Sequence, residues 1–280
     1  MANQHPIAKL VPLNIISYLL GCFVSIRWPK PFSWLFNGLF VTAFKIDMEE
    51  SEKPMIEFDS IQGVFTRALK PGERAIEGNF VSPADGALSQ MGEAKDGHGV
   101  QAKGLDYNLR DLVYESFEAV NGESLNSFAT VYLAPHNYHR VHTPVTGKLK
   151  KVRYIPGELW PVNEPFVKFM PNLFVRNERL VFDIELPTGG FVHAVMVGAL
   201  NVGRISSPFV SNFISNDYFK KSESFEREMN IDIKAGDELG TFMLGSTVVL
   251  VLDKDAEKEI KLPTLSQKRL VRMGEDLLKP

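Results

Sequence analysis

The feature that most constrains the fold is a series of short apolar runs that begins after residue 79. Several of the runs alternate apolar and polar residues, as strands with one buried face do. The segments Pro-Ala-Asp-Gly, Pro-Val-Thr-Gly and Pro-Thr-Gly-Gly between them are typical of turns. The runs span residues 80–82, 127–133, 148–155, 180–186, 191–200 and 241–252. This pattern predicts an α+β protein whose main domain is mostly antiparallel β.

The same patterns of apolar, charged and turn residues divide the chain into four parts. Residues 1–46 are an N-terminal helical segment, 47–78 a charged linker and a helix, 79–253 the β-rich domain, and 254–280 a charged C-terminal tail on the surface. The helix of the second part is expected to start at Asp59 or Ser60, to bury a face running from Ile61 to Leu69, and to end before Pro71.

Composition excludes several classes of protein. A chain of 280 residues with 44% hydrophobic residues can bury one substantial core. A net charge of −3 without a long Lys/Arg run argues against a nucleic-acid partner. Cys22 is the single cysteine, so neither an internal disulfide nor a Cys-x-x-Cys zinc site is possible.

Residues 1–46 carry basic residues but no Asp or Glu. The apolar run at 12–26 is interrupted by polar residues and is shorter than the ~20 residues that span a bilayer. A second helix is expected from Pro31, with Phe32, Leu35, Phe36, Leu39, Phe40 and Phe44 on one stripe and Ser33, Asn37 and Thr42 opposite.

Near the start of that helix lie Trp28 and Trp34 with Arg27 and Lys30, residue types that settle at a lipid headgroup boundary. This grouping favours two amphipathic helices in the membrane interface over the alternative, a helix whose apolar stripe faces the core. Leu19-Leu20-Gly21-Cys22 is similar to a lipoprotein cleavage box, but the apolar run continues past Cys22, so lipidation is not favoured.

Three segments carry candidate chemistry. Gly245-Ser246 interrupts the strand-like run 241–252, where a glycine marks either an ordinary bulge or a close backbone approach. His136, His139 and His142 lie within seven residues and could serve as acid and base or as surface histidines; no metal-ligand spacing accompanies them. Asp85 lies in a Pro/Gly turn, where aspartate is common for structural reasons.

Asp85, His142 and Ser246 could together form a triad in which the carboxylate orients the imidazole and the imidazole deprotonates the serine. A serine hydrolase is therefore one interpretation. No Gly-x-Ser-x-Gly elbow is present, however, and Ser246 is surrounded by apolar strand residues. Triad chemistry directed at the carbonyl of Gly245 fits this setting better.

Three segments together resemble the signature motifs of the phosphatidylserine decarboxylase family, in the same order. They are Ser82-Pro83-Ala84-Asp85-Gly86, Tyr138-His139-Arg140-Val141-His142 and Leu244-Gly245-Ser246-Thr247. Residues 65–71, 154–159 and 171–179 are similar to the family as well. His136-Asn137 and Glu164 depart from the usual pattern of the family. The sequence therefore does not identify which residues bind the headgroup.

The resemblance implies a proenzyme that cuts itself. Asp85 would orient His142, which would deprotonate Ser246 for attack on Gly245, giving subunits 1–245 and 246–280. Ser246 would become a pyruvoyl group that forms a Schiff base with the substrate amine, without a metal or pyridoxal phosphate. His139 would protonate the carbanion to give phosphatidylethanolamine and carbon dioxide.

The resemblance also implies partners and a location. The partners are phosphatidylserine in an anionic membrane and the two subunits of one precursor, and a homo-oligomer stays open. The expected location is peripheral, on the cytoplasmic face of the cell membrane. The serine hydrolase and a non-catalytic membrane-bound β domain are the alternatives.

Overall fold

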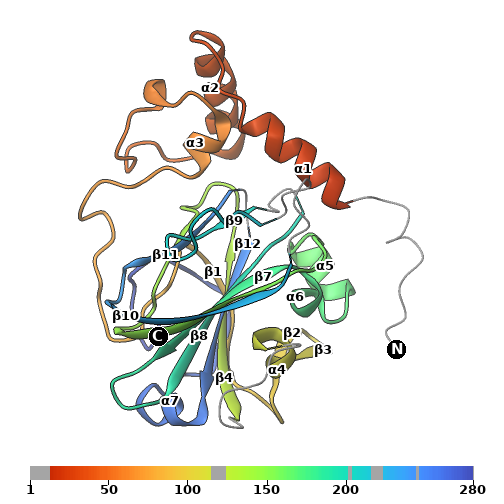
Figure 1. The fold of residues 1–280 in the computed structure, drawn as a ribbon, viewed down its shortest axis with the longest axis vertical. Helices are drawn as coiled ribbons and strands as arrows, with labels where there is room; N and C mark the ends of the chain where they lie inside the picture. Colours follow the sequence, from red (N-terminus) through yellow and green to blue (C-terminus); the bar gives the residue numbers. More distant parts are fainter. Residues whose placement is uncertain (1–12, 115–123, 201–203, 216–222, 244–245, 280) are drawn as a thin grey trace.

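A computed structural model of the chain describes residues 13–114, 124–200, 204–215, 223–243 and 246–279 (Figure 1). Its core is an eight-stranded sheet with the order β10-β6-β7-β8-β12-β4-β1-β13, and every neighbouring pair is antiparallel. The strands are β1 (Gly86–Glu93), β4 (Leu125–Leu133), β6 (Gly147–Ile155), β7 (Arg179–Glu185), β8 (Phe191–Val197), β10 (Phe225–Ile233), β12 (Ser246–Asp253) and β13 (Arg269–Val271). The prediction of an α+β protein with mostly antiparallel strands is confirmed.

Strand β12 lies inside this sheet, between β4 and β8. Its residues from Val248 to Leu252 are all fully buried, so both faces of the strand are covered. Burying an aliphatic side chain of this size contributes about 1.5–3 kcal/mol. The apolar run therefore makes β12 a central strand of the core.

Two smaller sheets complete the β structure. One joins β5 (Arg140–His142), β11 (Glu238–Phe242) and β9 (Ile205–Ser206), and the other joins β2 (His98–Ala102) and β3 (Leu105–Asn108). The prediction of one continuous run over 241–252 is wrong, because β11 belongs to the small sheet and β12 to the large one. The chain changes sheets between Phe242 and Ser246.

The helices are short. They are α1 (Leu13–Val24), α2 (Phe32–Phe44), η2 (Met55–Glu57), α3 (Ile61–Phe65), α4 (Leu109–Val113), α5 (Glu164–Phe169), α6 (Leu173–Arg176) and α7 (Lys254–Glu259). Helix α3 starts after Ser60, whose side-chain oxygen accepts from the Gly63 amide at 3.1 Å, as the capping pattern predicts. It ends at Phe65, earlier than the periodicity suggested.

The C-terminal segment is more than a surface tail. Helix α7 occupies the expected place on the surface, but β13 pairs with β1 at the sheet edge. Val271 and Leu277 are buried in the core. The sequence of this segment is mostly charged, so its few apolar residues did not indicate that the segment packs on the sheet.

Helices α1 and α2 lie at one end of the molecule, beyond the large sheet (Figure 1). Among the described residues, no helix is long and apolar enough to cross a membrane. Ser33 and Asn37 are buried, whereas Leu35 and Leu39 are 57% and 60% exposed. The amide of Asn37 donates to the Phe58 carbonyl at 2.9 Å. Ser33 and Asn37 of the polar face thus pack on the protein, although Thr42 is exposed and Phe40 of the apolar stripe contacts Phe65. An apolar stripe that faces the core as a whole is wrong for this helix, since Leu35 and Leu39 are exposed.

Candidate active site

The three sequence motifs meet at the C-terminal end of β4. The His142 amide donates to the Pro83 carbonyl at 2.8 Å, which joins the second motif to the first. Gly86 lies so close to β4 that a Cβ atom there would overlap the Tyr132 carbonyl oxygen. The next residue of β4, Leu133, pairs with Ser246 of β12. Segments far apart in sequence are therefore brought to one place.

Backbone contacts hold the chain on both sides of residues 244–245. The Phe242 amide donates to the His139 carbonyl at 3.0 Å, and the Met243 amide donates to the Arg204 carbonyl at 3.0 Å. Pairing with Leu133 places the backbone of Ser246. Gly245, the predicted cleavage position, lies outside the described residues.

His142 has a partner at each ring nitrogen. Nδ1 lies 2.7 Å from the Gly236 carbonyl oxygen, which can only accept, so Nδ1 carries the proton. Nε2 lies 3.0 Å from the Tyr138 hydroxyl and accepts from it. Burial lowers the pKa of His142, which keeps the ring neutral. A neutral imidazole with its lone pair on Nε2 has the form of a general base.

Asp85 is held by different groups. The Arg74 guanidinium donates from Nε at 2.9 Å and from Nη2 at 2.5 Å, and the Met273 amide donates at 2.8 Å. Arg74 also pairs with Glu50 at 2.6 Å. Burial opposes the charge of Arg74, but the hydrogen bonds to Asp85 and Glu50 raise its pKa above the ordinary value. Arg74 thus fixes Asp85 in place.

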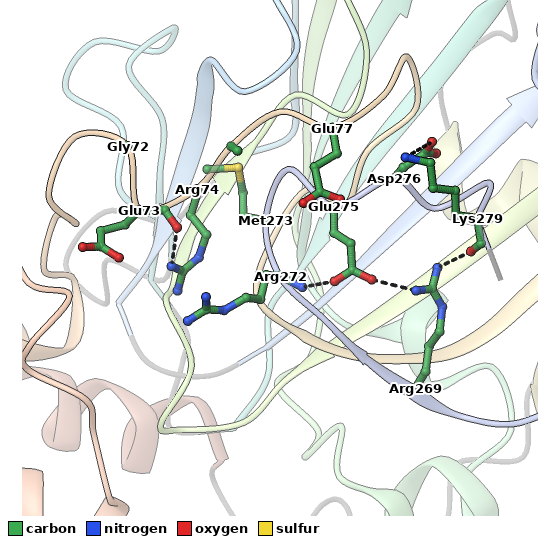
Figure 2. A pocket seen from close by; sticks show the side chains of 11 residues that line it. Gly72, Glu73, Arg74, Glu77, Arg269, Arg272, Met273, Glu275, Asp276 and Lys279 are labelled. Atoms are coloured by element: carbon green, nitrogen blue, oxygen red, sulfur yellow. Dashed lines mark hydrogen bonds and ion pairs between the residues drawn. The ribbon is translucent and has the colours of Figure 1, made fainter.

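Arg74 and Met273 also line a cavity of about 430 Å³ between residues 72–77 and the C-terminal segment (Figure 2). The direct hydrogen bond from His142 to Asp85 that the triad predicts is absent from these described side chains: Gly236 takes its place on the imidazole. The charge of Asp85 still favours the protonated form of His142, although burial is the stronger influence on its pKa.

His139 is fully buried, and only one of its two ring nitrogens has a hydrogen-bond partner. Its Nδ1 lies 2.9 Å from the Asn137 carbonyl oxygen, and its Nε2 has no partner. The Phe65 ring of α3 covers the imidazole, with centroids 3.8 Å apart. Burial lowers the pKa of His139 to about 3. A buried nitrogen without a partner needs an explanation, and a ligand that enters the site would provide one.

The structure adds residues that sequence reasoning missed. Arg74 and Gly236 position Asp85 and His142, and Tyr138, known only as a motif member, contacts the His142 ring. The Gly236 contact crosses 94 residues and the Arg74 contact 11 residues, so no local pattern indicates them, whereas Tyr138 lies only four residues before His142. Within the described part of the chain, no cluster of three His, Cys, Asp or Glu side chains could hold a metal ion.

Comparison with known proteins places the chain in a family. The sequence model of the phosphatidylserine decarboxylase family matches residues 61–279. A protein of Idiomarina loihiensis is 40% identical over 95% of this chain and 92% of its own length. Proteins of Alcanivorax borkumensis and Psychrobacter cryohalolentis are each 38% identical, covering 89% and 95% of this chain and 87% and 95% of their own lengths. All three are named phosphatidylserine decarboxylase proenzyme. The chain belongs to the phosphatidylserine decarboxylase family.

Proposed function

We propose that this chain decarboxylates phosphatidylserine to phosphatidylethanolamine and carbon dioxide after cutting itself between Gly245 and Ser246. The observation that carries the proposal is that the segment 83–85, which contains Asp85, contacts His142 while His139 contacts the segment before Ser246. The name proenzyme, shared by the relatives, supports processing of a precursor. A serine hydrolase or a non-catalytic domain would need no such processing.

In the proposed cleavage, Nε2 of His142 takes the proton of the Ser246 hydroxyl, and the oxygen attacks the Gly245 carbonyl carbon. The peptide C–N bond breaks as an ester C–O bond forms. Loss of the Ser246 α proton then breaks the Cβ–Oγ bond and releases Gly245 as a carboxylate. Water replaces the nitrogen, which leaves as ammonia, and residue 246 ends as a pyruvoyl group.

A pyruvoyl group supplies a carbonyl that withdraws electrons from the α carbon of a bound amino acid, which no ordinary side chain can do. The site fits such a group, because His139 offers a buried nitrogen without a partner. We infer that His139 protonates the substrate carbon. The neutral ring must first take up a proton, and a substrate carboxylate nearby would raise its pKa.

The burial of His139 predicts a loss of stability in acid. Its pKa is about 3 in the folded chain and about 6.5 in the unfolded one, so the unfolded chain binds more protons below pH 6.5. Stabilisation that is present above pH 6.5 is therefore lost as the pH falls, by about 2 kcal/mol between pH 7 and pH 5. Denaturant unfolding of Ser246→Ala protein, with and without His139→Gln, measures it. A difference between the two proteins that is the same at both pH values contradicts the expectation.

We also propose that residues 1–46 attach the protein to the membrane surface, on the cytoplasmic face of the cell membrane. The outward positions of α1 and α2 support this, since Leu19, Phe23, Leu35 and Leu39 are all at least 45% exposed. Arg27 and Lys30 between the helices would attract anionic lipid.

Replacing apolar residues on this face should release the protein from lipid. The double variant Leu35→Glu/Leu39→Glu is expected to bind phosphatidylserine vesicles at least about tenfold more weakly, because two carboxylates replace apolar contacts. Self-cleavage should stay complete. Leu270→Glu is the matched control, since Leu270 is 81% exposed on β13. Vesicle flotation measures binding, and equal flotation of both variants and the unmodified protein would refute membrane attachment through α2.

A further inference from the structure

A buried guanidinium without a direct ion-pair partner among the described residues lies beside the candidate active site. Arg67 is 3% exposed, and its Nε and Nη1 have no hydrogen-bond partner. Nη2 reaches the His136 carbonyl oxygen only at 3.5 Å. Burial lowers the pKa of Arg67, and the charges of Asp85, Glu50 and Asp47 offset this effect only in part. A buried cation left in this state calls for a ligand or another function.

The other large cluster of basic residues differs from Arg67, because its cations form ion pairs. In the cavity of Figure 2, the cations already have carboxylate partners. The pairs are Arg74 with Asp85 and Glu50, Arg272 with Glu50, Arg269 with Glu275, and Lys279 with Asp276. The positive charges of that cavity are neutralised by carboxylates of the protein itself, so the cavity gives no reason to expect a bound anion.

Arg67 instead lines a second cavity, of about 230 Å³. Lys53, Arg140 and one carboxylate, Glu52, also line it, and Arg140 is paired with Glu238 at 3.0 Å. Pockets that enclose drug-sized ligands measure roughly 300–1,000 Å³. The cavity therefore suits one charged fragment of a lipid better than a whole lipid.

Residues that line the cavity connect it to the N-terminal helices and to the neighbourhood of His139. Phe58 lines it, and its carbonyl accepts from Asn37 of α2. Arg140, which follows His139 in the chain, lines it as well. A lipid with its acyl chains at α2 and its amine at the active site would have its phosphate between these two ends.

We propose that Arg67 binds the phosphodiester of the phosphatidylserine headgroup in this cavity, an inference that rests on the proposed function. Nε and Nη1 of Arg67 carry three N–H groups without a partner, and the oxygens of a phosphate are strong acceptors for a guanidinium. The carboxylate of the substrate is the poorer choice, because it becomes neutral carbon dioxide. A guanidinium paired with it would stabilise the ground state more than the transition state and so slow the reaction.

The test compares Arg67→Met and Arg67→Lys with the unmodified protein. Both variants should self-cleave fully, because cleavage requires no substrate. For phosphatidylserine in mixed micelles, Arg67→Met should raise KM about 10- to 100-fold with little change in kcat, and Arg67→Lys should recover part of the loss. Removing an unpaired buried charge should leave Tm unchanged or raise it. Arg110→Met, at an exposed arginine of α4, is the matched control.

Soluble probes separate the possible anions. sn-Glycero-3-phosphoethanolamine contains the phosphodiester but no carboxylate, and its inhibition constant should rise with KM in Arg67→Met. If KM rises and this constant does not, Arg67 binds the carboxylate and the assignment is wrong. If Arg67→Met abolishes inhibition by inorganic phosphate while KM for the lipid is unchanged, the cavity is a free-phosphate site and the assignment is also wrong.

The remaining outcomes separate this inference from the proposed function. An unmodified protein that releases no carbon dioxide from phosphatidylserine contradicts the function itself. An active protein whose Arg67→Met variant keeps its KM contradicts only the role of Arg67. A fall in Tm and kcat at constant KM would assign Arg67 a structural role and overturn the inference.

Discussion

Ser246→Ala is expected to remain a single chain of 31.4 kDa and to release no carbon dioxide from phosphatidylserine above the uncatalysed rate. Without the hydroxyl, nothing can attack the Gly245 carbonyl, and without cleavage no electron-withdrawing carbonyl forms at position 246. The backbone should tolerate the change, because Ser246 contributes its strand register and alanine can keep it. Denaturing gel electrophoresis and release of labelled carbon dioxide measure the two effects.

Ser266→Ala is the control, since Ser266 is an exposed serine in the same C-terminal part of the chain. It should cleave and turn over as the unmodified protein does. The two pieces of a cleaved protein should still co-elute under native conditions, because β12 pairs with both β4 and β8. A cleaved Ser246→Ala protein, or one with full turnover, would exclude the proposed mechanism.

His142→Ala and His139→Ala are expected to fail at different steps. His142 has the form of a general base, so its loss should leave the precursor whole. His139→Ala should still be cut, but its turnover should fall about 10²–10⁴-fold, the usual contribution of a positioned acid or base. Cleavage on a denaturing gel and carbon dioxide release by the same preparation separate the two roles.

His98→Ala is the control, because His98 is exposed and its ring contacts only the nearby Asp96 carbonyl. Identical behaviour of the His139 and His142 variants would contradict the division of roles. So would a His142→Ala protein that cuts itself at the normal rate.

Much of the β structure could be predicted from the sequence because its signals are local. Alternation and turn residues predict β4, β6, β7 and β8 to within a few residues. The division of this run into β11 and β12 could not be predicted, since it depends on pairing with different distant strands. Periodicity also could not say which face of α2 is buried, because that depends on the contact between Asn37 and Phe58.

The residues of the candidate site also fall into two groups, those that the sequence predicts and those that it does not. The motif histidines and Asp85 were found because their residue types and order carry the chemistry. Their partners were not, since Arg74 reaches Asp85 from the linker and Gly236 meets His142 across 94 residues. Arg67 had only a place in a family-like stretch, and its importance comes from the absence of a direct ion-pair partner in the described structure.

Self-cleavage is tested by the intact mass of the freshly purified, unmodified protein under denaturing conditions. Two chains are expected, one ending at Gly245 and one starting at residue 246, the second lighter by one ammonia than residues 246–280 with an unchanged serine. A single uncut chain that decarboxylates phosphatidylserine, or a small chain that begins with intact Ser246, would contradict this expectation.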